Sequence, residues 1–225
     1  MVKKAAVFDQ YALDLEMPLS APAFLAPHVQ VPPGGRILDG GCGDGRFLAF
    51  CQREAPEALT IGIDVSWIRV RRTAEKGFIV SQADVENLPF ANQTFNLVLL
   101  IEVIEHTWHP EAVLAEVARV LLQDGRLILT TPNYKIKRAY DWLDYLRGVH
   151  ASPADDPTHF SPLSGRRIKR LCLRYFVTVE GEVSHIAGEG RWPVVARLRS
   201  VPFVADLLGR KIVLFCRQPL QRASR

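Results

Sequence analysis

Short apolar runs alternate with amphipathic stretches along most of this chain. The amphipathic stretches repeat apolar residues every three or four positions, which predicts helices over residues 45–55, 67–77, 109–125 and 164–175. The apolar runs predict strands at residues 36–40, 59–66, 78–85, within 95–106, and at 126–133, 176–180 and 211–218. Continuous apolar strands alternating with helices indicate an α/β fold: a Rossmann-like, doubly wound, mostly parallel seven-stranded sheet with helices on both faces.

The same pattern favours a single domain over residues 1–225. Residues 1–34 are interrupted by prolines and are expected to form a lead-in of one short helix and turns. Residues 134–165 and 181–210 are long for connections within a compact domain, so we interpret them as insertions that form a lid or contact an acceptor. The stretch 191–211 mixes apolar residues with arginines, which favours a packed helix and leaves open a peripheral contact with an anionic membrane.

The apolar runs and the cysteines of the sequence indicate the cellular compartment of the protein. No apolar run approaches the ~20 residues that a membrane-spanning helix needs, and acidic residues interrupt the N-terminal stretch before any long apolar segment. The four cysteines are scattered without metal-site or disulfide-framework spacing. These features predict a cytoplasmic protein with reduced thiols.

Charge is distributed unevenly. Residues 1–125 contain 10 Lys and Arg against 16 Asp and Glu, whereas residues 126–225 contain 18 against 8. The basic half suits phosphate, nucleic acid or an anionic surface, and a solvated surface is an equally good interpretation.

The sequence "RILDGGCGDG" places a glycine-rich turn directly after the first expected strand. Such turns bind nucleotides in α/β sheets because the ligand approaches the backbone closely. The dinucleotide fingerprint would need a third glycine where Arg46 stands, and the preceding Asp39 is a poor neighbour for a pyrophosphate. A carboxylate suits a ligand with an ammonium group, a ribose and an adenine, which describes S-adenosylmethionine (SAM).

Two further acids follow the next two strands. Asp64 ends the second and is expected to accept hydrogen bonds from ribose hydroxyls. Asp84 ends the third, where a carboxylate can accept from the adenine amine while the Val85 backbone faces the ring edge. Three acids at the carboxyl ends of successive parallel strands are expected to form one row over one crevice.

The segments "ILDGGCGDGRFL", "IGIDVS", "ADVENLPF", "FNLVLLIEVIEH" and "EVARVLLQDGRLILTTPN" together resemble the successive motifs of class I SAM-dependent methyltransferases, in order and spacing, over about residues 35 to 133. "LLQDGR" departs from the usual proline-glycine before strand five but keeps the glycine. The resemblance extends to quinone-pathway O-methyltransferases. It implies a cofactor site with Asp39, Gly41 and Gly43 at the methionine end, Asp64 at the ribose, Asp84 and Val85 at the adenine, and Glu102 beside the methyl donor. Cys42 and Val65 are predicted as further cofactor-binding residues.

The chemistry is expected after the fourth strand. Glu102, Glu105 and His106 form an E-x-x-E-H pattern, which in similar enzymes can hold a divalent metal, with His159 as a further candidate. Without a metal, His106 can act as an acid or base, or position the acceptor, or be merely structural. Amine-methylating nucleic-acid enzymes often carry an Asn/Asp-Pro-Pro-aromatic signature here, and this chain does not.

The sequence therefore predicts a SAM-dependent methyltransferase acting on a small-molecule or lipid-like acceptor, at oxygen. The alternatives are an RNA methyltransferase, which would use the basic half, and a SAM-binding protein without catalytic activity. A nicotinamide oxidoreductase is disfavoured by the missing third glycine and by Asp39.

Overall fold

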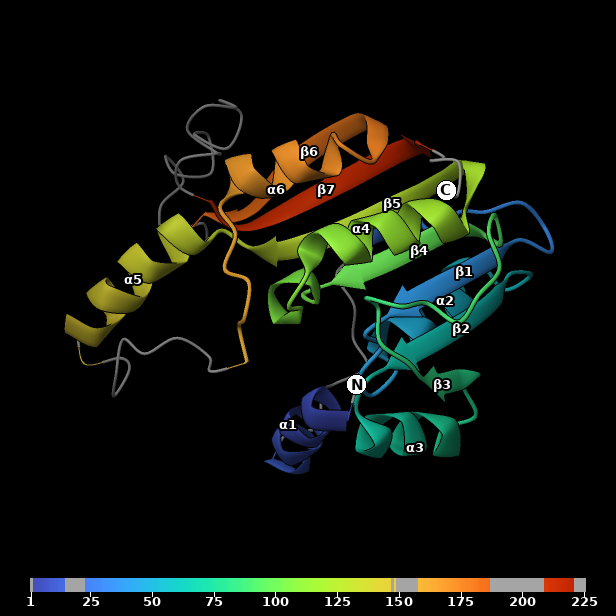
Figure 1. Ribbon diagram of the computed structural model, residues 1–225, viewed down its shortest axis with the longest axis horizontal. Helices are drawn as coiled ribbons and strands as arrows, with labels where there is room; N and C mark the ends of the chain where they lie inside the picture. The colour runs from blue at the N-terminus through green and yellow to red at the C-terminus, as the bar shows by residue number, and fades with distance from the viewer. Residues whose placement is uncertain (1, 15–22, 147, 149–157, 187–208, 221–225) are drawn as a thin grey trace.

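The computed structural model describes residues 2–14, 23–146, 148, 158–186 and 209–220. Within these ranges the chain forms one sheet flanked by helices (Figure 1). The strands are β1 (Arg36–Gly40), β2 (Leu59–Asp64), β3 (Val80–Gln82), β4 (Phe95–Ile101), β5 (Leu121–Pro132), β6 (Phe176–Ile186) and β7 (Gly209–Pro219). The helices are α1 (Val2–Asp14), α2 (Arg46–Glu54), α3 (Trp67–Glu75), α4 (Pro110–Val120), α5 (Tyr134–Leu146) and α6 (Gly165–Cys172), with short 3-10 helices η1 (Ala23–His28) and η2 (Ile104–His106).

The sheet has seven strands in the order β3-β2-β1-β4-β5-β7-β6. The first five strands along the chain run parallel to one another. β7 runs antiparallel to both of its neighbours, β5 and β6. The prediction of a mostly parallel seven-stranded sheet is confirmed. The order reverses between β1 and β4, and such a switch point is where open α/β sheets form a ligand-binding crevice.

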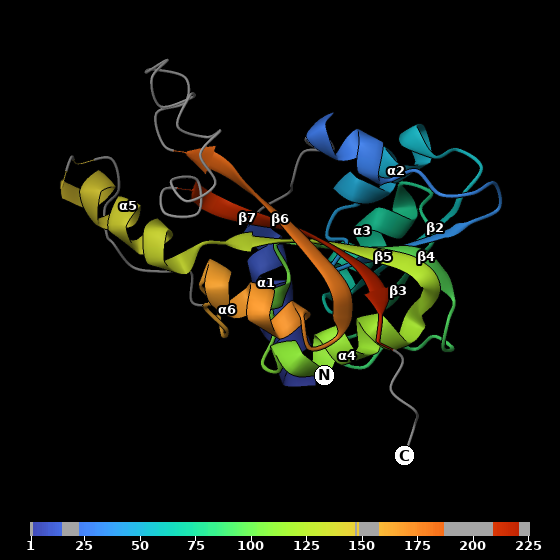
Figure 2. The same cartoon turned by 90° about the horizontal axis from the view of Figure 1, so that it is seen from above.

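Helices cover both faces of the sheet. Successive side chains on a strand point to opposite faces, so each strand contributes to two apolar cores. Leu38 belongs to the apolar core that includes α4 and α6, whereas its neighbour Ile37 belongs to the core that includes α2 and η1. Figure 2 shows α4 and α6 on one side of the sheet and α2 and α3 on the other. The continuous apolar strands of the sequence follow from this double burial.

Several boundaries differ from the sequence prediction. The helix expected over 109–125 ends at Val120, because β5 begins at Leu121, which pairs with Phe95 before the register shifts. The third strand, expected over 78–85, is only Val80–Gln82. Asp84 therefore lies just beyond it, in an isolated bridge with Asn87.

The insertion expected at 181–210 is shorter than predicted, because β6 continues to Ile186 and β7 already begins at Gly209. Most of the predicted helix over 191–211 lies outside the described residues; its last three residues instead begin β7. In the other insertion, α5 extends away from the end of the sheet (Figure 1). Among the described residues, no helix has the length and apolar character needed to cross a membrane.

Candidate cofactor and methyl-transfer site

The turn between β1 and α2 has a backbone that only glycine fits. Gly41 has φ +76°, and a Cβ atom there would lie 2.6 Å from Cγ2 of Val103. Gly43 has φ +54°, also in the left-handed region that side chains rarely adopt. The backbone N–H groups of Gly41 and Cys42 both donate to the Ile63 carbonyl, at 2.8 and 2.9 Å. The turn therefore lies tightly against the end of β2.

Asp64 ties this turn to the one after β2. Its Oδ2 accepts a hydrogen bond from the Gly43 N–H at 2.9 Å, and its Oδ1 accepts one from the Ser66 N–H at 2.8 Å. Burial raises the pKa of the carboxyl, while these two backbone donors and Arg69 act against the rise. A carboxylate oxygen can accept more than one hydrogen bond, so Asp64 retains acceptor capacity toward a ligand in the adjoining cleft.

A cleft of about 550 Å³ opens at the carboxyl ends of the strands. Its volume lies within the range of ligand pockets. Nine of the ten residues predicted from the sequence for cofactor binding or catalysis line it: Gly41, Cys42, Gly43, Asp64, Val65, Asp84, Val85, Glu102 and His106. None of the described α5 side chains does, so the role of residues 134–165 as a lid stays a prediction.

Asp39, the tenth predicted residue, lies beneath the turn and is only 1% exposed. Its Oδ2 has no hydrogen-bond partner among the described residues. Burial, and secondarily the Asp64 carboxylate, raise the pKa of Asp39 to about 8. Without a ligand, Asp39 is therefore mostly protonated at neutral pH, and a cation bound nearby would favour its ionised form.

This raised pKa predicts that Asp39→Asn stabilises the protein increasingly with pH. The folded state keeps the Asp39 proton up to pH about 8, whereas the unfolded chain releases it near pH 4, so folding becomes less favourable as pH rises between these values. Without ligand, we expect the melting temperature of Asp39→Asn to exceed that of the wild type by about 7 °C or more beyond the pH 5 difference when both are measured at pH 8. Thermal melts at both pH values measure this, and a gap independent of pH would contradict it.

Helix α1 completes one wall of the cleft, which sequence analysis did not predict. Lys4, only 3% exposed, donates to Asp84 at 2.8 and 3.1 Å and to Glu86 at 2.7 Å. Asp9 accepts hydrogen bonds from the Ser66 hydroxyl at 2.6 Å and the Ile68 N–H at 3.1 Å, at the start of α3. The lysine of an N-terminal lead-in gives no local signal that it will pair with an acid 80 residues away.

Glu102 stands at the end of β4 in the left-handed region, with φ +57°. Its Oε1 accepts from the Thr130 hydroxyl at 2.8 Å, and its Oε2 lies 3.3 Å from the Lys211 ammonium. Lys211 comes from β7 and also lines the cleft. The carboxylate is thus held by β5 and β7, two elements that follow it in the sequence.

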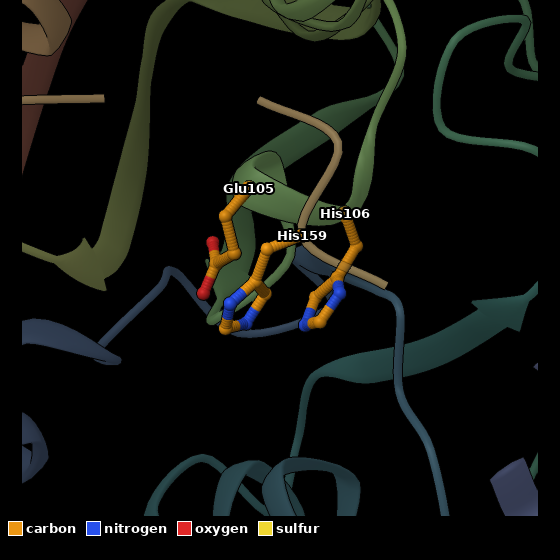
Figure 3. A group of neighbouring side chains, drawn as sticks. All are labelled: Glu105, His106 and His159. Carbon is orange, nitrogen blue, oxygen red and sulfur yellow. The ribbon is translucent and has the colours of Figure 1, made fainter. Parts of the chain in front are cut away.

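The E-x-x-E-H pattern assembles differently from its sequence prediction. The ligand atoms of Glu105, His106 and His159 lie within 4.8 Å of one another (Figure 3), whereas Glu102 is not part of this group. Glu105 is 1% exposed and accepts from the Thr131 hydroxyl at 3.1 Å. Its burial, with the nearby Glu102 charge, raises the pKa of Glu105 to about 8. His159, a secondary candidate in the sequence, takes the third position.

The His106 ring is oriented by contacts on two sides. Its Nδ1 lies 3.1 Å from the Thr158 carbonyl and 3.0 Å from the Thr158 hydroxyl. The ring edge packs against Phe8 of α1 with centroids 5.6 Å apart. If Nδ1–H donates to the carbonyl, then Nε2 carries the lone pair, the tautomer that a general base or a metal ligand requires. Thr158, like Lys4, was not predicted as a site residue.

The fold is that of a doubly wound α/β protein with a cleft at the carboxyl ends of its parallel strands, where such sheets form their ligand-binding crevice. A family model described as a methyltransferase domain matches residues 14–175. The match covers well over half of the chain, which therefore belongs to this family of SAM-dependent methyltransferases.

Curated relatives named as methyltransferases are similar to part of this chain. A malonyl-[acyl-carrier protein] O-methyltransferase of Herminiimonas arsenicoxydans is 32% identical over 130 residues, 57% of this chain and 48% of its own. A ubiquinone/menaquinone biosynthesis C-methyltransferase of Bordetella parapertussis is 34% identical over 134 residues, 55% and 52%. The chain thus spans about half the length of these relatives.

Solved structures show the same fold at low identity. A SAM-dependent methyltransferase from Archaeoglobus fulgidus superposes with a TM-score of 0.63 at 18% identity, covering 87% of this chain and 91% of that one. At this identity the likeness concerns the fold alone.

Proposed function

We propose that the cleft binds SAM across the carboxyl ends of β1, β2 and β4. In this arrangement the glycine turn faces the methionine end with Asp39 buried beneath it, and Asp64 accepts from the ribose hydroxyls. The adenine lies near Asp84 and Val85, and Glu102 stands beside the methyl donor. The observation that carries the proposal is Asp64: a buried carboxylate that fixes the glycine turn and borders the cleft.

The proposed contact between the Asp84 carboxylate and the adenine amine involves a third group. Asp84 is paired with Lys4, so α1 must move, or the adenine must share the Asp84 carboxylate with the Lys4 ammonium. A carboxylate can accept from both, since each oxygen has two lone pairs. We therefore assign α1 to the wall that encloses the adenine.

The acceptor is proposed to be a small or lipid-like molecule methylated at oxygen. In support, the relatives include the carrier-protein O-methyltransferase and a phthiotriol/phenolphthiotriol dimycocerosates methyltransferase of Mycobacterium ulcerans, 34% identical over 109 residues, 47% of this chain and 40% of that one. The quinone relative is a C-methyltransferase, so the relatives do not agree on the atom. An acceptor hydroxyl needs a base, and His106 lines the same cleft as the proposed cofactor residues.

His106 is proposed as the general base. Methyl transfer from a sulfonium is a displacement on an already activated donor, so positioning supplies much of the rate. What remains is the hydroxyl proton, which the imidazole Nε2 would accept as the oxygen attacks the methyl carbon. The alternative is a divalent cation held by Glu105, His106 and His159, whose mixed nitrogen and oxygen donors fit a transition metal better than Mg²⁺. Such an ion would lower the pKa of the hydroxyl.

The test follows a ¹³C-labelled methyl group from SAM into lipid extract, carrier-protein fractions, small metabolites and total RNA. We expect label in a small or lipid-like product, with the carbon chemical shift of a methyl group attached to oxygen. Label confined to RNA, or attached to carbon, would overturn the proposed acceptor while leaving the methyltransferase assignment in place. An acceptor found this way supplies the substrate for the kinetic experiments below.

A further inference from the structure

A second hollow lies between α4 and α6, outside the proposed cofactor site. It measures about 470 Å³ and combines two kinds of side chain. Trp108 and Phe160 supply aromatic surface; they are 47% and 38% exposed, with ring centroids 6.0 Å apart. Arg167 and Arg170 line the same hollow from α6, and Arg174 lines it from the turn that follows the helix. We call this hollow the arginine groove.

The arginine groove has a strong excess of positive charge. Each of its three arginines is exposed, and the described part of the chain shows no salt bridge to any of them. One acid, the exposed Glu111, also lines the groove, which leaves a net charge of two positive units. Three of the 18 Lys and Arg residues of the basic half therefore line one concave site.

The groove and the main cleft share a wall. Thr158 and His159 contact the ring of His106, which lines the main cleft, whereas the next residues, Phe160 to Leu163, line the groove. The Ser161 N–H donates to the Glu105 carbonyl at 2.9 Å, and its hydroxyl donates to the Thr107 carbonyl at 2.7 Å. A ligand in the groove is therefore separated from the proposed base by one short, hydrogen-bonded segment.

Guanidinium groups beside an aromatic surface bind phosphate groups attached to an apolar or planar body. Arginine pairs with phosphate through two parallel hydrogen bonds, and an aromatic ring packs on the rest of the molecule. The hollow, of about 470 Å³, has room for one such group, which favours a single phosphate ester as the ligand. We propose that the arginine groove binds a phosphate ester, and that this phosphate belongs to the acceptor or to its carrier.

The second half of this inference rests on the proposed function, whereas phosphate binding by the groove does not. The phosphate would anchor one end of the acceptor over α6 while its reactive end reaches His106 around the shared wall. Free acceptor, carrier-linked acceptor and a phospholipid headgroup present the same phosphate chemistry, and the experiment separates soluble from membrane sources.

The test uses phenyl phosphate, which carries the two features that the groove should recognise, with phenol and inorganic phosphate as its two halves. Titration followed by calorimetry at low salt should show phenyl phosphate binding at least about tenfold more tightly than either half. The double variant Arg167→Glu/Arg170→Glu should weaken binding by at least about tenfold.

The matched control is Arg166→Glu/Lys169→Glu. These two residues are exposed on the same helix and give the same change of net charge, but they do not line the groove. We expect this control to change phenyl phosphate binding by less than about twofold. Both variants should keep the SAM affinity and melting temperature of the wild type, which separates a groove defect from misfolding and from failure of the proposed cofactor site.

Sedimentation with phosphatidylglycerol vesicles, compared with phosphatidylcholine vesicles, then shows whether the bound phosphate belongs to a lipid headgroup or to a soluble ester. Binding to phosphatidylglycerol that needs Arg167 and Arg170 assigns a lipid headgroup, and phenyl phosphate binding without vesicle binding assigns a soluble or carrier-linked ester. Equal losses in the two double variants would show diffuse attraction and overturn the inference. Phenyl phosphate binding no tighter than phenol, or tight binding of single-stranded RNA alone, would also overturn it.

Discussion

Replacing Asp64 with alanine should weaken SAM binding by about 100-fold or more, because two kinds of interaction are lost together. Hydrogen bonds to a charged acceptor contribute about 1.5–3 kcal/mol each, and the proposed ribose contact would supply two. The same change leaves the Gly43 and Ser66 N–H groups without their acceptor, which loosens the turn that approaches the cofactor. Asp64→Asn keeps the shape and one acceptor oxygen and should lose about tenfold.

A ribose contact can be separated from a collapsed turn by changing the ligand as well as the protein. Adenosine and 2′,3′-dideoxyadenosine differ only in the two hydroxyls that Asp64 is proposed to bind. The wild type should prefer adenosine, and Asp64→Ala should bind both about equally; this double-mutant cycle, measured by calorimetry, isolates the contact. If Asp64→Ala still preferred adenosine as strongly as the wild type, the ribose assignment would be wrong.

The second large effect concerns His106. Its replacement by alanine should lower kcat by about 10²–10⁴-fold, the usual contribution of a positioned acid or base. SAM affinity should stay near the wild-type value, since the imidazole is assigned to the acceptor. Steady-state rates with the acceptor identified by the labelling experiment, together with calorimetric SAM titration, measure both quantities.

Three further measurements distinguish a base from a metal ligand. If His106 acts alone, His159→Ala should keep most of the activity, and a chelator should have no effect. If a cation is held by Glu105, His106 and His159, then chelation should abolish the activity and a transition metal should restore it. Full activity in His106→Ala would exclude both roles and leave the ring as packing for Phe8 and Thr158.

The sequence predicted the fold well because its strongest signals are local. The continuous apolar run of β4 requires burial on both faces, and a helix on each side provides it. The glycines at 41 and 43 indicated a turn without side chains, and the structure gives the reason at Gly41, where Val103 occupies the space a side chain would need. These features depend on neighbouring residues, so they can be read from one chain.

Boundaries were less accurate where a distant strand decides them. Residues 109–125 keep a helical apolar period through Leu121. The chain nevertheless leaves the helix at Val120, because the Thr94 N–H donates to the Val120 carbonyl and Leu121 pairs with Phe95. β6 likewise extends beyond residue 180 because β7 offers a partner as far as Gly209.

By itself, the sequence determined the doubly wound sheet, the side-chain-free turn and the acids that follow its strands, since each is written in the spacing of nearby residues. Only the tertiary structure decided that Lys4 would pair with Asp84, that His159 rather than Glu102 would join Glu105 and His106, and that three arginines would share a hollow with Trp108. These groups come from segments far apart in the chain. Their proximity follows from the packing of α1, α4 and α6 around the sheet, which no local pattern of residues records.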